Sequence, residues 1–279
     1  RGINEVAAAR GYTVILSISE RRLGRECEML DLFMAEQVDG IVLCTTARLG
    51  EGEHLDQLKR RQIPFVLIDR YLAHVETDFV VSDNDAGGYQ LLSHVLDAGH
   101  RRVGILVTDE SISSVRDRMS GCTRALDDHG ILDEDRLVRK VSIFSDQGIT
   151  RNMASLYRAL DELMKGGAPP SALVTMSSDL TPGALGWLTH HGIRVPEDVT
   201  LAAFDQIPLL SSLGIQVTTV AQEPFEMGSG ATRLLLDRIS GKERGHGQVK
   251  IATNLIESGE GGMEWLDMTT VAAGASRSQ

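Results

Sequence analysis

The chain is 279 residues long and 42% hydrophobic, which is enough for two modest α/β lobes with a sizeable core and excludes a disordered chain. It has 39 acidic and 28 basic residues, a formal net charge of −11, and its basic residues are scattered. Nucleic acids and anionic membranes are bound by clustered basic surfaces. The composition therefore argues against this polypeptide being the part of a protein that binds either of them.

The dominant pattern along the chain is strand, helix, strand, repeated. A helix is predicted over residues 1–10, a strand rich in β-branched residues over 12–19, and a helix over 23–34. A charged helix around 53–61 follows, between short strands at 38–43 and 65–68. Further strands are predicted at 79–82, 102–107, 137–143, 172–176, 200–204, 217–220 and 249–256. Further helices are predicted at 85–98, 116–129, 149–165, 180–191 and 224–240.

The predicted strands are short and almost wholly apolar, as in Gly104–Val107 and Ala172–Val174. Such strands suit sheets that are covered on both faces, and alternation with helices implies parallel, doubly wound sheets with right-handed crossovers. Glycines just past four predicted helices are in positions typical of left-handed helix caps. The elements are too numerous for one compact open sheet, so the sequence predicts two lobes.

The first predicted element is a helix, although the first strand of a doubly wound sheet is usually central. We therefore expect the natural gene to encode residues upstream of Arg1. At the other end, residues 259–279 are rich in Gly, Ala and Ser and are expected to form a poorly ordered extension.

Known catalytic and metal-binding motifs are absent from the sequence. It has no Gly-x-Ser-x-Gly elbow, no Gly-x-x-x-x-Gly-Lys-[Ser/Thr] loop and no His-Glu-x-x-His pair. Asp83-Asn84-Asp85 is interpreted as a helix N-cap, because Gly87 and His94 occupy the fifth and twelfth positions that a calcium loop reserves for its ligands. We expect no metal, no cofactor, no catalytic residue and no enzymatic activity.

The cysteines point to a reducing compartment. Their number is odd, none forms a Cys-x-x-Cys pair, and all are interpreted as buried free thiols of a cytoplasmic protein. They are Cys27, Cys44 and Cys122.

Polar residues gather just after the predicted strands, where open α/β sheets bind their ligands. Carboxylates and guanidinium groups bond the vicinal hydroxyls of a small polar ligand in pairs, and an aromatic ring can cover an apolar sugar face. The alternative for each residue is a helix cap or a surface ion pair. The contacts predicted on this ground are Asp69, Arg70, Ser114, Arg118, Phe144, Ser178 and Asp205.

Several short segments of the sequence are informative when their order and spacing are taken together. The set is Val38–Leu43, Pro64–Arg70, Asp83–Gly88, Ala98–Gly104, Arg116–Gly121, Pro196–Thr200, Phe204–Asp205 and Thr218–Gln222. Together these segments resemble the effector-binding core of the lactose-repressor/galactose-repressor family of bacterial transcription regulators, over residues 1 to 257.

The resemblance implies two similar lobes of the periplasmic-binding-protein type, joined by three crossing segments near 81–83, 221–224 and 251–252. It assigns 1–81 plus 223–251 to an N-terminal lobe that lacks its first strand. It assigns 82–222 plus 252–258 to a C-terminal lobe, with 259–279 as a tail.

The same resemblance implies a cytoplasmic homodimer that senses a small effector, a sugar or sugar derivative, between its lobes. It adds Gln222 to the ligand contacts. The family's helix-turn-helix lies outside this sequence, so operator DNA would be bound only through a segment absent from the chain. An extracytoplasmic sugar-binding protein of a transporter would share fold and cleft and remains the alternative. The free cysteines and Gly99–Arg102 favour the regulator.

Overall fold

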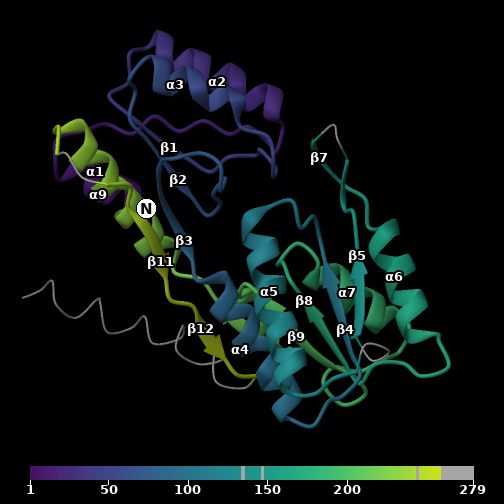
Figure 1. The fold of residues 1–279 in the computed structure, drawn as a ribbon. Coiled ribbons are helices and arrows are strands. Elements are labelled where there is room, and N and C mark those ends of the chain that lie inside the picture. Colours follow the sequence, from purple (N-terminus) through teal and green to yellow (C-terminus); the bar gives the residue numbers. More distant parts are fainter. Residues whose placement is uncertain (133–135, 146–147, 243–244, 259–279) are drawn as a thin grey trace, which may run out of the picture.

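Two sheets, one in each of two lobes, organise the protein (Figure 1). The computed structural model describes residues 1–132, 136–145, 148–242 and 245–258, so the tail predicted over 259–279 lies outside the described residues. Both sheets are mainly parallel and both are covered by helices. The predicted α/β class with two lobes is confirmed.

The N-terminal lobe is built on a four-stranded parallel sheet. Its strands, in spatial order, are β1 (Ile41–Leu43), β2 (Phe65–Ile68), β3 (Asp78–Ser82) and β11 (Gln248–Ile251). Its helices are α1 (Gly2–Ala8), α2 (Leu23–Ala35), the 3-10 helix η1 (Glu53–Leu55), α3 (Asp56–Arg60) and α9 (Pro224–Ile239). Along β2, Phe65 and Leu67 pack with α2 and α3, and Val66 packs with α9 on the opposite face.

The C-terminal lobe is built on a six-stranded sheet, parallel except where β12 pairs with β10. Its strands, in spatial order, are β12 (Asn254–Ile256), β10 (Thr218–Ala221), β9 (Thr200–Phe204), β8 (Ala172–Thr175), β4 (Val103–Val107) and β5 (Arg136–Lys140). Packed on opposite faces are α4 (Asn84–Asp97) with α5 (Ser113–Asp128), and α6 (Ala154–Met164) with α7 (Thr181–His190).

Most predicted elements are present to within a few residues, and two details of their ends are confirmed. The glycines at 99, 130, 192 and 241 all have positive φ, as expected of left-handed caps. Asp83 caps α4, because its carboxylate accepts a hydrogen bond from the Ala86 backbone N–H at 3.2 Å.

Two predicted elements differ from the structure and one helix was missed. The helix predicted over 149–165 begins only at Ala154, because a hairpin of β6 (Phe144–Ser145) and β7 (Gly148–Arg151) precedes it. The strand predicted over 249–256 is two strands, since the chain passes from β11 in one sheet to β12 in the other. The short helix α8 (Pro208–Ser212) was not predicted.

The strand predicted over 12–19 is also absent. Its β-branched composition suits a strand, but no backbone hydrogen bond among the described residues joins residues 13–18 to a neighbour. Ile15, Leu16 and Ile18 are therefore 60%, 83% and 65% exposed. Within the described part of the chain, β1 pairs only with β2, so the other edge of β1 is open.

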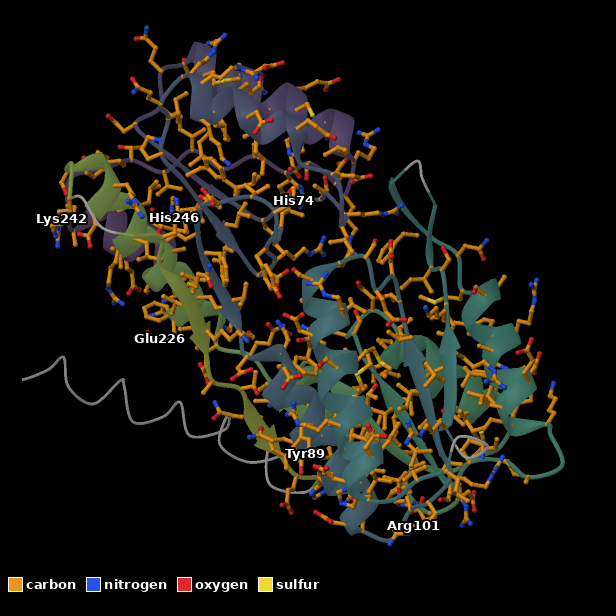
Figure 2. All side chains as sticks on the ribbon, in the orientation of Figure 1. His74, Tyr89, Arg101, Glu226, Lys242 and His246 are labelled. Atoms are coloured by element: carbon orange, nitrogen blue, oxygen red, sulfur yellow. The ribbon has the colours of Figure 1, made fainter. Side chains whose placement is uncertain are left out.

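The helices α4 and α5 approach each other closely through glycine. A Cβ atom added at Gly121 would lie 2.0 Å from the carbonyl oxygen of Asp85, and one added at Gly88 would lie 2.1 Å from the carbonyl oxygen of Arg118. Tyr89, which Figure 2 labels on α4, ties the two helices by donating to Asp128 at 3.1 Å. The glycine contacts at residues 118 and 121 and this bond at the last residue of α5 together fix how α5 lies on α4.

Replacing Gly121 with alanine is expected to lower the free energy of unfolding by about 2 kcal/mol, because the new methyl group must push two backbones apart. Urea unfolding measures the effect. Gly186→Ala in α7 is the matched control, since nothing lies within 4 Å of its added Cβ. That variant should be unchanged or more stable by up to about 1 kcal/mol. Equal effects at both positions would contradict the close approach.

Candidate functional site

A cleft of about 1190 Å³ lies between the two lobes, and side chains from both extend into this region (Figure 2). The structure brings all of the sequence-predicted contacts to its lining. These are Asp69 and Arg70 after β2, Ser114 and Arg118 on α5, Phe144 on β6, Ser178 after β8, Asp205 after β9 and Gln222 after β10. The cleft exceeds the several hundred cubic ångströms that a drug-sized ligand fills.

Two aspartates occupy equivalent positions, one in each lobe. Asp69 follows β2 and Asp205 follows β9, and both have left-handed backbones, with φ of 68° and 77°. The backbone N–H of each donates to the next strand, to Val80 at 3.0 Å and to Val220 at 2.9 Å. A non-glycine residue in this region costs about 1 kcal/mol or more. The sheets therefore hold both carboxylates at the cleft against local strain.

Arg118 is the most enclosed charged residue of the cleft, with 5% of the residue exposed. Its Nε donates to Asn84 Oδ1 at 2.8 Å and its Nη1 donates to the Met176 carbonyl oxygen at 2.9 Å. Its guanidinium lies 3.7 Å from the ring centre of Phe204. Since α5 carries Arg118, the close packing of α5 on α4 sets the position of this cation.

The charge of Arg118 is balanced by the two strand-end aspartates. Burial lowers the pKa of the Arg118 guanidinium, while the carboxylates of Asp205 and Asp69 act in the opposite direction. Asp205 Oδ2 is 3.6 Å from Arg118 Nη1. A guanidinium stays charged in proteins, so the site has a fixed buried cation next to carboxylates that can accept hydrogen bonds.

The carboxylate of Asp205 is oriented by three neighbours. Ser178 Oγ donates to Asp205 Oδ2 at 3.3 Å, and the amide of Gln222 donates to Asp205 Oδ1. Together with Arg118, these partners fix the plane of the carboxylate. The lone pairs of the carboxylate that remain free can accept hydrogen bonds from the hydroxyl groups of a ligand.

Arg70 contributes a cation to the N-terminal side of the cleft. Arg70 Nη1 donates to the Thr45 carbonyl oxygen at 3.4 Å. Arg70 Nε is buried, lies 3.4 Å from Asp69 Oδ2, and makes no hydrogen bond to any of the described residues. Buried donors are normally satisfied, so this atom is an exception, and the cleft-lining carboxylate of Asp69 is its nearest charged neighbour.

Sequence reasoning missed two arginines that reach across the cleft. Arg21 Nη2 is 2.8 Å from Asp179 Oδ2, and its guanidinium covers the ring of Phe144 at 4.0 Å. Arg48 Nε is 3.0 Å from Asp109 Oδ2. Arg48 follows β1, so the strand-end rule could have found it. Arg21 depends on a left-handed turn, which no local signal indicates.

The charges that line the cleft balance one another. Seven basic and seven acidic side chains contribute to the lining, although the whole chain has a net charge of −11. The cleft is therefore locally richer in cations than the rest of the protein, without attracting ions of either sign by net charge. This balance suits a polar ligand without net charge.

The described residues contain no group of three His, Cys, Asp or Glu side chains placed to hold a metal ion. None of the helices in this part of the chain combines the length and apolar character needed to cross a membrane. Of the cysteines, Cys122 is buried as predicted, but Cys27 is half-buried and Cys44 is exposed.

Comparison with known proteins is consistent with this architecture. Residues 92–259 match a family model described as a periplasmic binding protein-like domain. The HTH-type transcriptional repressor CytR of Escherichia coli strain K12 is 27% identical, over 93% of this chain and 73% of its own length.

Two solved structures are similar over nearly the whole chain. A LacI family transcriptional regulator from Enterococcus faecium with bound ribose has 25% identity and a TM-score of 0.76, covering 92% of this chain and 90% of its own. The complex of the transcriptional regulator CelR with cellobiose has 25% identity and a TM-score of 0.77, covering 93% of this chain and 76% of its own.

Proposed function

Because the chain belongs to the family of periplasmic binding protein-like domains, we propose that it is the effector-binding core of a bacterial transcriptional regulator of the lactose-repressor/galactose-repressor family. The effector is a small polar molecule bound between the lobes, a sugar or sugar derivative. The repressor relatives support this proposal over a transporter's extracytoplasmic binding protein and over an enzyme.

The observation that carries the proposal is the pair of strand-end aspartates facing one buried arginine. Asp69 and Asp205 offer acceptors from opposite lobes, while Arg118 and Arg70 offer donors. A polyhydroxylated ligand uses both kinds of group, because each hydroxyl donates one hydrogen bond and accepts others. The balanced charge of the cleft favours a neutral sugar over a phosphorylated one.

The mechanism proposed is a change in the relative orientation of the lobes. Residues 1–81 plus 223–251 form one lobe and 82–222 plus 252–258 the other. An effector that contacts both lobes stabilises the orientation in which all of its contacts are made, and typical coupling is about 1–3 kcal/mol. In a cytoplasmic homodimer this shift would change the separation of two DNA-reading segments. Leu209 on α8 and Leu213 just after it are exposed and suited to contact a second copy.

A thermal-shift screen with sugars, including D-ribose and cellobiose, tests the proposal. A ligand present at 100 times its Kd stabilises the folded state by about 2.7 kcal/mol, so a raised Tm is expected for at least one sugar. Calorimetry should then show at least a ten-fold weaker affinity for Asp205→Asn, with Asp198→Asn as control. Asp198 pairs with Arg194 in an exposed ion pair. If no sugar raises the Tm, or if Asp205→Asn binds as tightly as wild type, the proposed function is wrong.

A further inference from the structure

Two buried residues at the first crossing between the lobes are bonded to the cleft. Ser82 is the last residue of β3 and Asn84 is the first of α4, and they are 2% and 3% exposed. Asn84 Oδ1 accepts from Arg118 Nε at 2.8 Å, and Ser82 Oγ donates to Gln222 Oε1 at 2.6 Å. Neither residue lines the cleft, but each touches a side chain that does.

These contacts close into a ring. The amide of Gln222 donates to Asp205, which is 3.6 Å from Arg118, and Arg118 donates to Asn84. Asn84 Nδ2 completes the ring by donating to the Ser82 carbonyl oxygen at 3.0 Å. Each member of the ring therefore has a partner on both sides.

The orientation of both amides in the ring is dictated by chemistry. Arg118 can only donate, so the oxygen of Asn84 must face it and the NH₂ must face the Ser82 carbonyl. The Asp205 carboxylate accepts, so the NH₂ of Gln222 faces it and leaves the amide oxygen for the Ser82 hydroxyl. The donors and acceptors admit a single assignment, from Arg118 through Asn84, Ser82 and Gln222 to Asp205, and losing one bond leaves a buried group unpaired.

The ring also involves the other crossings. Gln222 directly follows β10 at the second crossing, and the Asp83 backbone N–H donates to the Ile251 carbonyl oxygen at the third, at 2.7 Å. Any rotation of one lobe against the other changes the backbone in these segments. Such a rotation would change the geometry of bonds that also hold Arg118 and Asp205.

We propose that Ser82 and Asn84 are positioning residues that couple the ligand-binding groups Arg118 and Asp205 to the crossings between the lobes. This proposal rests on the proposed function in one respect, because it assumes that the cleft binds an effector. A ligand hydroxyl that competes with Gln222 for Asp205 releases the amide, and the released amide weakens the bond to Ser82. The coupling thus follows hydrogen bonds and needs no movement of either sheet's core.

Hydrogen–deuterium exchange followed by mass spectrometry tests the proposal without any ligand. Ser82→Ala removes one bond of the ring. Asp205→Asn replaces one carboxylate oxygen of the ring with an NH₂ group, at a residue that lines the cleft. Both variants should exchange at least five-fold faster than wild type in peptides covering 82–84 and 221–223, while β8 stays unchanged. Ser93→Ala is the matched control, because its buried hydroxyl has no hydrogen-bond partner among the described residues.

Unchanged exchange at both crossings in Ser82→Ala and Asp205→Asn would overturn the proposal. An equal acceleration in β8 would also overturn it, since Ser82 would then only support the fold. Asn84→Asp provides a second readout, because it keeps an acceptor for Arg118 and loses the donor to Ser82. It should accelerate exchange at 82–84. The exchange experiment needs no ligand, so its result can be interpreted even if the separate screen finds that no sugar binds.

Discussion

Replacing Arg118 with alanine is expected to lower the free energy of unfolding by about 3–5 kcal/mol and to abolish effector binding. The guanidinium is almost fully buried and has partners on every side, namely Asn84, the Met176 carbonyl, Asp205 and the ring of Phe204. Its removal leaves the Asp205 carboxylate without its cation and two buried acceptors without a donor. This side chain therefore serves stability and binding together.

Urea unfolding and calorimetry measure the two effects of Arg118→Ala separately. Arg116→Ala is the control, because Arg116 lies on the same helix, is one-third exposed and contacts Tyr71 and Asp117. It should cost less than about 1 kcal/mol, as partly exposed ion pairs usually do. Arg118→Lys should recover part of the stability, since one ammonium cannot reproduce the forked contacts of a guanidinium. An Arg118→Ala variant as stable as Arg116→Ala would refute this account.

The second large effect is expected at Glu26, a 2% exposed residue of α2. Its carboxylate accepts hydrogen bonds from Thr45 Oγ1 at 2.7 Å, from the Thr46 backbone N–H at 2.5 Å and from His54 Nε2 at 2.9 Å. These bonds hold the loop that follows β1, which contributes Thr46 to the cleft. Glu26→Gln is expected to cost about 3 kcal/mol at neutral pH, because the amide cannot accept from all these donors.

The cost of Glu26→Gln should depend on pH in a defined direction. Burial alone would raise the pKa of Glu26, but the hydrogen bonds from His54, Thr45 and Thr46 outweigh it and lower the pKa below 4.5. A carboxyl with a depressed folded-state pKa contributes stability above its unfolded pKa and loses it as pH falls through the folded one. The difference between wild type and Glu26→Gln should therefore shrink below about pH 4.5.

Urea unfolding at pH 7 and at pH 4 measures this difference. Glu28→Gln is the control, since Glu28 is exposed on the same helix and should change stability by less than about 0.5 kcal/mol at either pH. A gap between wild type and Glu26→Gln that widens on acidification would show that the carboxylate is not stabilised by these bonds.

The residues that line the cleft were predicted from the sequence more accurately than the bounds of the elements around them. Asp69, Arg70 and Asp205 do line the cleft, and they were predicted because the rule that ligands bind beyond strand ends needs only the position of a short apolar run. The resemblance to lactose-repressor/galactose-repressor regulators, drawn from motif order, is confirmed by the repressor relatives. Both inferences rest on local sequence features, which do not depend on how the two lobes are arranged.

What could not be predicted depends on partners distant in the sequence. Asp83 was correctly assigned as an N-cap, but the bond from Arg118 to Asn84 exists only because α5 packs on α4. Arg21 reaches Asp179 over a separation of 158 residues. Residues 12–19 have the composition of a strand, yet a strand also needs a neighbour, and the described chain provides none.

The left-handed backbone shared by Asp69 and Asp205 restricts how the ligand preference of this cleft can evolve. Aspartate, asparagine and glycine are the residues that adopt this conformation most readily, so most other substitutions would be selected against for conformational reasons. An exchange of aspartate for asparagine keeps the backbone and replaces an acceptor with a donor. If the cleft binds an effector as proposed, a single exchange of aspartate for asparagine at either position would change the hydrogen bonds offered to the ligand without rebuilding either sheet.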